Sequence, residues 1–245
     1  MWVAAFVAGV ASAIVYWRRH RAAGERQRRL MHLCERAGLA FAPMDLAPDT
    51  AWLPFPIFGH LRRGTENVVW DRARGPEIRV FDQWYADPKD EQAIAPIERR
   101  TCAVVPLAAS CPRLRIAPRD LADGARALLG LREVRLELEA FNRRFVVESE
   151  DERFAIAFLE QRMMEGLLAL PPTVTAEVNE HVLLLSAPTL PAEQVLRLFD
   201  AAVELHERIP RSLGSLFPPR PQRAPFEERW LHGSWTPDPT GTGGA

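Results

Sequence analysis

The chain has 245 residues, of which 47% are hydrophobic and 26% charged, a balance that is typical of globular proteins and too apolar for a disordered chain. The formal net charge is -1, so the chain as a whole lacks the basic field that attracts nucleic acid, and no nucleic-acid partner is expected. Three cysteines, Cys34, Cys102 and Cys111, are too few and too irregularly spaced for a disulfide framework or a zinc site.

The N-terminal residues 2–17 carry no charged side chain, which predicts a transmembrane helix. As a helix this run spans about 24 Å, slightly less than the hydrocarbon core of a typical bilayer. Trp2 and Trp17 would lie in the two interfaces, where amphipathic aromatic rings are enriched. Two alternatives stay open. One is a signal peptide cleaved at Ala11-Ser12-Ala13, although no positive charge precedes the run, and the other is a buried core helix.

A strongly basic stretch follows the apolar segment directly. Positive flanks stay in the cytoplasm, so the prediction is a single-pass cell-membrane protein with a cytoplasmic body, whereas signal cleavage would give a secreted chain. Each basic residue near an anionic leaflet adds about 1 kcal/mol of attraction, so the stretch is expected to contact the lipid bilayer. The predicted membrane-surface residues are Arg18, Arg19, Arg21, Arg26, Arg28 and Arg29. Small residues recur every four positions at Ala5, Gly9 and Ala13, a spacing that could let two anchors associate weakly.

The first half of the chain beyond the anchor predicts one short helix, a loop and several strands. The helix covers 28–37 and ends at Gly38. The run 43–64, rich in proline and aromatic residues, has no regular period and predicts an ordered loop that packs on the body. A turn signal at 71–76 makes the first two strands a hairpin. The predicted strands are 67–70, 77–85, 101–107 and 114–117, followed by a short helix at 119–129.

The second half carries clearer signals. Ser149 and Glu152 predict a capping box that opens a helix over 151–169. The last helix, 191–209, carries an apolar stripe at helical spacing. The predicted strands are 134–138, 144–148, 174–178 and 181–187. The fold class is therefore α+β, an antiparallel sheet of about seven or eight strands with helices on one face, preceded by the single transmembrane helix.

These elements divide the chain into four regions. The proline-rich C-terminus is predicted to be disordered, although the aromatic run 226–235 could dock on the body or on a partner. The predicted regions are the anchor 1–17, a basic stalk with the short helix at 18–42, the soluble body 43–209 and the tail 210–245.

The run from Leu136 to Asp151, LELEAFNRRFVVESED, followed by a helix with Met163-Met164, resembles a family of bacterial membrane-anchored proteins that contain a domain of unknown function. Upstream, Phe58-Gly59 and the pattern Val80-Phe81-Asp82-x-x-Tyr85 are similar to what such proteins show. The resemblance covers residues 55–208 and rests on packing signals of strands and helices. It implies a tethered α+β domain and carries no catalytic residue over to this chain.

The sequence lacks the common catalytic motifs. It contains no phosphate-binding glycine loop, no HExxH run and no GxSxG run, and no cofactor or metal is expected. Cys102 or Cys111 with His60 or His181 could form a thiol nucleophile and its base, and the two cysteines could form a disulfide. A role as small buried hydrophobic residues suits both cysteines better.

Several aspartates surround the predicted hairpin. They could bind calcium or act as acid and base, but turn formation and a solvated surface are the favoured explanation. They are Asp71, Asp82, Asp87 and Asp90. Asp82 differs from the others because it lies inside a strand. If it is buried it needs a cationic partner, for which Arg79 and Arg99 are the candidates.

Two hypotheses for function follow. The favoured one is a single-pass, membrane-anchored binding or scaffolding module at the cytoplasmic face, with an unknown protein partner. The alternative is a membrane-associated enzyme of hydrolase type, with a site assembled from scattered polar residues. A concave pocket with two titratable groups within hydrogen-bond reach would favour the enzyme.

Overall fold

The computed structural model describes residues 21–44, 50, 53–60, 62–73, 75–86, 97–124 and 131–219. The predicted anchor 2–17 and the aromatic run 226–235 lie outside these residues. Within the part of the chain that is described, none of the helices is both long and apolar enough to cross a membrane.

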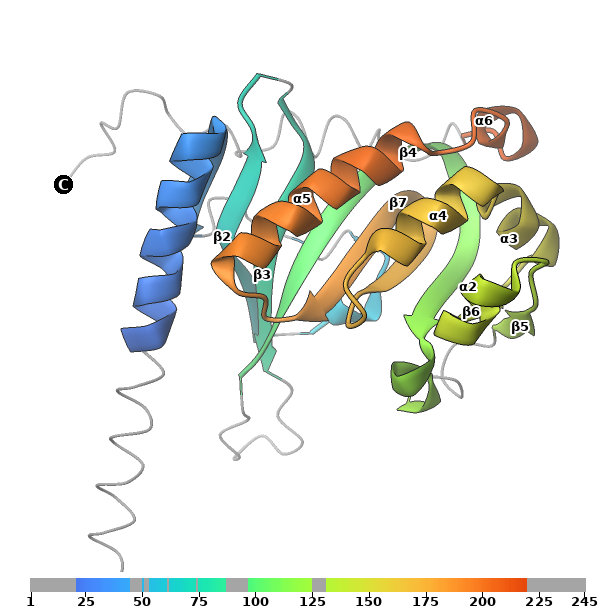
Figure 1. Ribbon diagram of the computed structural model, residues 1–245, viewed down its shortest axis with the longest axis horizontal. Helices are drawn as coiled ribbons and strands as arrows, with labels where there is room; N and C mark the ends of the chain where they lie inside the picture. The colour runs from blue at the N-terminus through green and yellow to red at the C-terminus, as the bar shows by residue number, and fades with distance from the viewer. Residues whose placement is uncertain are drawn as a thin grey trace, which may run out of the picture.

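The fold is α+β, as predicted, and is built on one seven-stranded sheet in which every pairing is antiparallel (Figure 1). The strand order is β1-β2-β3-β4-β6-β5, and β7 pairs with the other edge of β4. The strands are β1 Leu39–Met44, β2 Arg62–Asp71, β3 Gly75–Ala86, β4 Glu98–Pro118, β5 Arg132–Val134, β6 Phe145–Ser149 and β7 Thr175–Pro188. The predicted hairpin is confirmed as β2–β3, and the Asp71 carboxylate accepts a hydrogen bond from the backbone N–H of Ala73 in its turn (2.7 Å).

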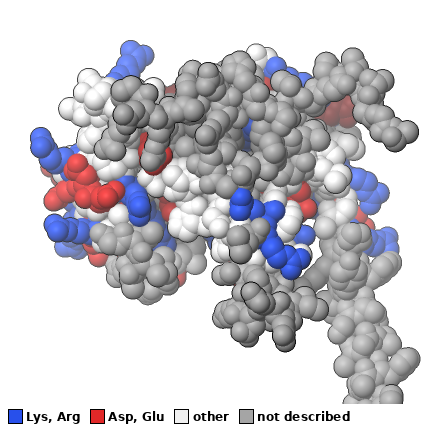
Figure 2. Space-filling view, turned by 180° about the vertical axis from the view of Figure 1, so that it is seen from behind, with Lys and Arg blue, Asp and Glu red and all other residues white. Residues whose placement is uncertain are grey.

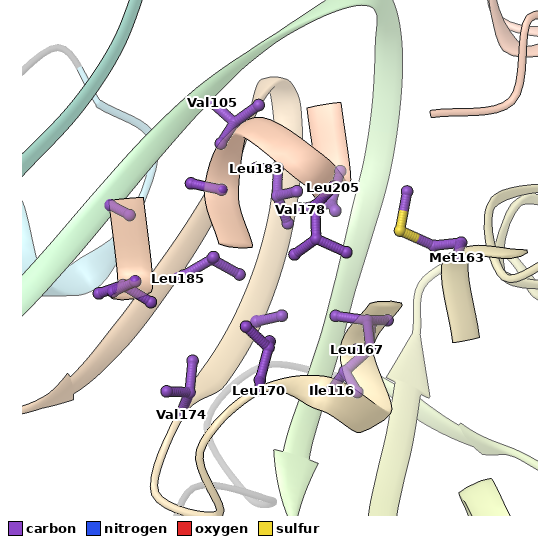
Figure 3. Close-up of a cluster of buried hydrophobic side chains, with 14 of the residues drawn as sticks. Val105, Ile116, Met163, Leu167, Leu170, Val174, Val178, Leu183, Leu185 and Leu205 are labelled. Carbon is purple, nitrogen blue, oxygen red and sulfur yellow. The ribbon is translucent and has the colours of Figure 1, made fainter. Parts of the chain in front are cut away.

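Strands β4 and β7 are each continuous where two strands were predicted. The register between them shifts at Pro106–Cys111 and again at Cys111–Leu114, and Glu180 of β7 has a left-handed backbone (φ 53°) at the same place. Such bulges bend a strand without ending it. Figure 3 shows the two strands turning together around this corner. The segments 108–113 and 179–180 do separate the strand patterns, as predicted, but they form bends within continuous strands and not loops.

The helices also differ from the prediction in places. The predicted helix 151–169 is broken between Phe158 and Gln161 into α3 and α4. The capping-box prediction is wrong, because Asp151 is the N-cap and its carboxylate accepts from the N–H groups of Arg153 (2.8 Å) and Phe154 (3.2 Å). The helical elements are an N-terminal helix 21–37, α2 Glu139–Arg144, α3 Glu152–Phe158, α4 Gln161–Ala169, α5 Ala192–Glu207, α6 Leu213–Leu216 and the 3-10 turns Pro56–Phe58 and Arg119–Gly124.

Both faces of the sheet are covered. The N-terminal helix, α4 and α5 cover one face and form the larger core, part of which is drawn in Figure 3. The apolar stripe predicted for the last helix is confirmed in α5, where Val195, Leu198, Phe199, Ala202 and Leu205 are all buried. The second face packs against the proline- and aromatic-rich loop, whose side chains Leu53, Phe55 and Phe58 are buried. The loop was thus predicted correctly as packing on the body.

The body is larger at both ends than its predicted limits of 43 and 209. At the N-terminal end, Leu30 and Cys34 are 0% exposed and belong to the main core, so the helix assigned to a stalk is part of the folded body. At the C-terminal end, the Phe217 ring packs edge-on against Phe154 (5.1 Å between centroids) and its carbonyl accepts from the N–H of Ser110 (3.0 Å). Residues 210–219 are therefore ordered, because they have apolar surface to bury.

Candidate functional site

Asp82 and Arg26 form a buried ion pair that joins the N-terminal helix to the sheet. The guanidinium of Arg26 donates from Nη1 to Oδ2 of Asp82 (2.6 Å) and from Nη2 to Oδ1 (3.1 Å), so the pair is bidentate. The Asp82 side chain is 2% exposed and that of Arg26 18%. Bidentate ion pairs are among the stronger polar contacts in proteins because both hydrogen bonds are charge-assisted.

Other strands and the helix complete the hydrogen bonding around Asp82. The side-chain amide of Asn67 on β2 donates to Oδ2 (2.9 Å), and the Thr101 hydroxyl on β4 donates to Oδ1 (2.8 Å). Gln27 donates to the Asn67 side-chain oxygen (3.1 Å). Arg26 also donates from Nε to the Leu190 carbonyl (2.6 Å), just before α5. Together, Arg26, Asp82, Asn67 and Thr101 form what we call the helix clamp.

The prediction that a buried Asp82 needs a cationic partner is confirmed, but both candidate partners are wrong. Arg79 lies on the opposite face of β3, since side chains alternate along a strand, and burial lowers its pKa to about 9. Arg99 pairs with Glu66 instead (2.9 Å). The sequence held a signal for Arg26, because Arg26, Leu30 and Cys34 are four residues apart and so share one helical face.

The clamp forms one wall of a groove of about 510 Å³ at the start of the N-terminal helix. The groove brings together two ion pairs, Arg26–Asp82 and Arg99–Glu66, each within hydrogen-bond distance. It therefore meets the geometric condition set for an enzyme. However, each carboxylate is already paired with a guanidinium, so neither is arranged as a general base facing a substrate. The arrangement is suited to holding the helix in place.

The arginines predicted to face lipid have different positions. Arg18 and Arg19 lie outside the described residues. Arg21 is exposed and pairs with Glu25 (3.2 Å), Arg28 donates to the Gly24 carbonyl (3.4 Å), and Arg29 pairs with Glu193 of α5. Arg26 is the exception: its guanidinium points into the body, so the membrane-surface assignment is corrected for this residue.

A second charged group lies on the loop-covered face and was not predicted. Arg115 of β4 donates to Glu148 of β6 (2.8 Å), and Glu177 is its neighbour on β7. Burial raises the pKa of Glu177, and the nearby Arg115 and Arg100 partly oppose this. A cavity of about 250 Å³ lies here, lined in part by Leu53, Pro54 and Phe55 of the loop. The sequence carries no signal for this group, because Thr175, Glu177 and Asn179 alternate with apolar residues as on a solvated strand face.

The cysteines do not form a reactive site. All three are free and buried, and burial raises the pKa of Cys34 to about 11, that of Cys111 to about 12 and that of Cys102 further still. Cys102 and Cys111 belong to the cores on opposite faces of the sheet, so they are not placed to form a disulfide. His60 stacks on Tyr85 instead of facing a thiol (4.4 Å between centroids). A neutral, buried thiol is a poor nucleophile.

The remaining candidate sites receive little support from the geometry. Asp71 serves the β2–β3 turn, whereas Asp87 and Asp90 lie outside the described residues. Among the residues that are described, no group of three or more His, Cys, Asp or Glu is placed to hold a metal ion. Basic and acidic side chains are interspersed on the face seen in Figure 2, in agreement with the net charge of -1.

No family model matches the chain, and no curated protein matches it. Among solved structures, it is similar to the crystal structure of the mycobacterial trehalose monomycolate transport factor A, TtfA, with a TM-score of 0.53. The two sequences are 14% identical, and the match covers 80% of this chain and 98% of that one. At this identity the likeness concerns the fold. The resemblance to membrane-anchored proteins of unknown function stays a prediction.

Proposed function

We propose that this chain is a single-pass, membrane-anchored binding or scaffolding module whose body lies at the cytoplasmic face of the cell membrane. The observation that carries the proposal is the helix clamp. The predicted apolar segment ends only four residues before the first described residue of the N-terminal helix, and that helix is joined to the sheet by a buried, bidentate ion pair. An anchor at 2–17 would therefore hold the body in a defined position and not on a flexible stalk.

The fold likeness supports an accessory role over catalysis. The similar structure is that of a transport factor. By analogy of fold, this chain would serve a transport system at the membrane by holding a protein partner. The paired carboxylates of the groove and the buried thiols agree with a module that binds and does not catalyse.

The anchor is tested by fractionation. The full chain should stay with membranes after washing at alkaline pH, whereas a chain lacking residues 1–17 should be found in the soluble fraction. Recovery of the full chain in the soluble fraction, or shortened to a mature form, would contradict the anchor.

The side of the membrane is tested with one introduced cysteine. Ile156 is 57% exposed, and the native thiols are buried, so Ile156→Cys should react selectively with a membrane-impermeant maleimide. We expect labelling in lysate and none in intact cells. Labelling in intact cells would place the body outside. Turnover of a substrate by the purified protein, abolished by a substitution in the body, would instead favour the enzyme hypothesis.

A further inference from the structure

The direction of the N-terminal helix along the sheet determines which end of the body lies nearest the predicted anchor. The helix ends at Gly38 and continues into Leu39, which is paired with Asp71 at the far end of β2. Gln27 contacts Asn67, and the residues around Gly24 share the groove with Glu66. Going back toward residue 21, the helix thus runs toward the start of β2. Figure 1 shows its first turn at the same end of the molecule as the end of β3 and the start of β4.

The strands reach at least as far in this direction as the helix does. Glu66 and Arg99 border the groove beside Gly24. From there β2 continues four residues to Arg62, while the chain extends two residues back from Arg99, through Glu98 at the start of β4, to Ile97 just before the strand. At about 3.3 Å per residue these extensions are about 13 Å and 7 Å, whereas the three residues from Gly24 to Arg21 rise only about 5 Å along a helix.

The tether between this end and the anchor is too short to hold the body away from a bilayer. Residues 17 and 21 are four apart, and even a fully extended chain spans only about 14 Å over that distance. Trp17 is predicted to lie in the interface itself, and the headgroup layer adds several ångströms of thickness on each side of the hydrocarbon core. Since the clamp keeps the helix on the sheet, an anchor at 2–17 would bring the strand ends within reach of the headgroup layer.

The side chains at this end suit such a position. Ile97 is 54% exposed, Arg62 is exposed, and Trp84 is partly exposed with its indole lying against the backbone of Gly64. Tryptophan is enriched at the membrane interface, and arginine is attracted to anionic lipids. An exposed isoleucine beside them is the kind of apolar side chain that inserts between headgroups.

We propose that the end of the sheet formed by Arg62, Trp84 and Ile97 rests on the lipid headgroups of the bilayer, so that the body lies against the membrane in one orientation. This inference rests on the proposed anchor and adds a second lipid contact to it. The partner is the anionic lipid surface.

The experiment places a fluorescent label on one or the other side of the body, with the full chain in vesicles of equal parts phosphatidylcholine and phosphatidylglycerol. Ile97→Cys and Ile156→Cys are matched variants, since both replace exposed isoleucines, of 54% and 57% exposure, in the same chain. Ile156 lies in α3, on the far side of the molecule from the N-terminal helix (Figure 1). Each thiol carries an environment-sensitive fluorophore, and nitroxide-labelled lipid headgroups serve as the quencher. We expect the label at 97 to lose most of its emission and the label at 156 to keep nearly all of it.

The outcomes separate the inference from the proposed function. Chain that stays in the vesicles with an unquenched label at 97 would overturn the lipid contact and leave the anchor intact. Equal quenching at both positions would overturn the single orientation. Release of the full chain from the vesicles by an alkaline wash would overturn the anchor and the inference together.

A charge reversal gives a second measurement, in which the altered residue is not the one that carries the label. In the Ile97→Cys background, Arg62→Glu should lower the quenching in the anionic vesicles, because it replaces attraction by repulsion. Arg153→Glu, which reverses an exposed charge on α3, should leave the quenching unchanged. Identical behaviour of the two variants would also overturn the inference.

Discussion

Removal of the Arg26 guanidinium should destabilise the body far more than the loss of an ordinary surface charge. Arg26→Met keeps the apolar stem of the side chain but removes both hydrogen bonds to Asp82 and one to Leu190. The Asp82 carboxylate, 2% exposed, would keep only the neutral donors Asn67 and Thr101. Breaking a buried pair by removing one partner costs about 3–5 kcal/mol, because the other charge is left desolvated.

Urea unfolding of the chain lacking residues 1–17, followed by circular dichroism, measures this loss. With a slope of about 2 kcal/mol per molar urea, the expected midpoint shift is about 2 M. Arg21→Met is the matched control, since its pair with Glu25 has side chains that are 64% and 56% exposed. An exposed pair contributes about 0.5 kcal/mol, so this variant should unfold almost like the parent chain.

A double substitution distinguishes the ion pair from general loss of packing. Arg26→Met combined with Asp82→Leu replaces the pair by apolar side chains, and such replacements are often nearly neutral. The double variant should therefore be less destabilised than the sum of the single variants, by about 2 kcal/mol or more. If Arg26→Met costs no more than Arg21→Met, or if the single effects simply add, the clamp does not hold the helix and the argument for a fixed body position fails.

Three further predictions concern the body. Burial raises the pKa of Glu177, so the folded state binds the proton of this carboxyl more tightly than the unfolded state does. The stability that comes from this proton is lost as pH rises through the folded pKa. Glu177→Gln should therefore melt at a higher temperature than the parent chain at about pH 8, and the difference should narrow toward about pH 5. Phe199 is 4% exposed, so Phe199→Ala should lower the free energy of unfolding by about 3–5 kcal/mol. Ile156→Ala on the surface should have a negligible effect, and equal melting temperatures of the two variants would refute the packing of α5. A Cβ at Gly64 would lie 2.7 Å from the Trp84 ring. Gly64→Ala should therefore shift the tryptophan fluorescence and lower the free energy of unfolding in urea by about 1–3 kcal/mol. An unchanged spectrum would mean that the ring does not lie there.

The sequence was informative where a signal is local and periodic. The stripe of α5 repeats at helical spacing, so its buried face followed directly. The turn at Asp71 and the packing of the aromatic loop were also predicted, because turn residues and closely spaced aromatic side chains occur in few other structural settings. Local features of this kind are sufficient to indicate the α+β class.

The sequence was less informative where a partner far along the chain decides the outcome. The predicted strand ended before residues 108–113, yet β4 continues through them because β7 supplies hydrogen bonds on the other side of the bulge. The sequence did not predict the burial of Glu177, since the environment of this side chain depends on Arg115 and on the loop that covers it. Local propensity cannot report such contacts.

The sequence by itself thus determined the composition of the body, the faces of its helices and a charge-free N-terminal run that predicts an anchor. Only the tertiary structure decided that Arg26 belongs to Asp82, 56 residues away, and not to a lipid surface. The reason is physical: an arginine that follows an apolar segment has the same local sequence whether it faces lipid or protein. Its position depends on which buried carboxylate the folded sheet brings within reach, because desolvating that carboxylate is tolerated only when a cation neutralises it.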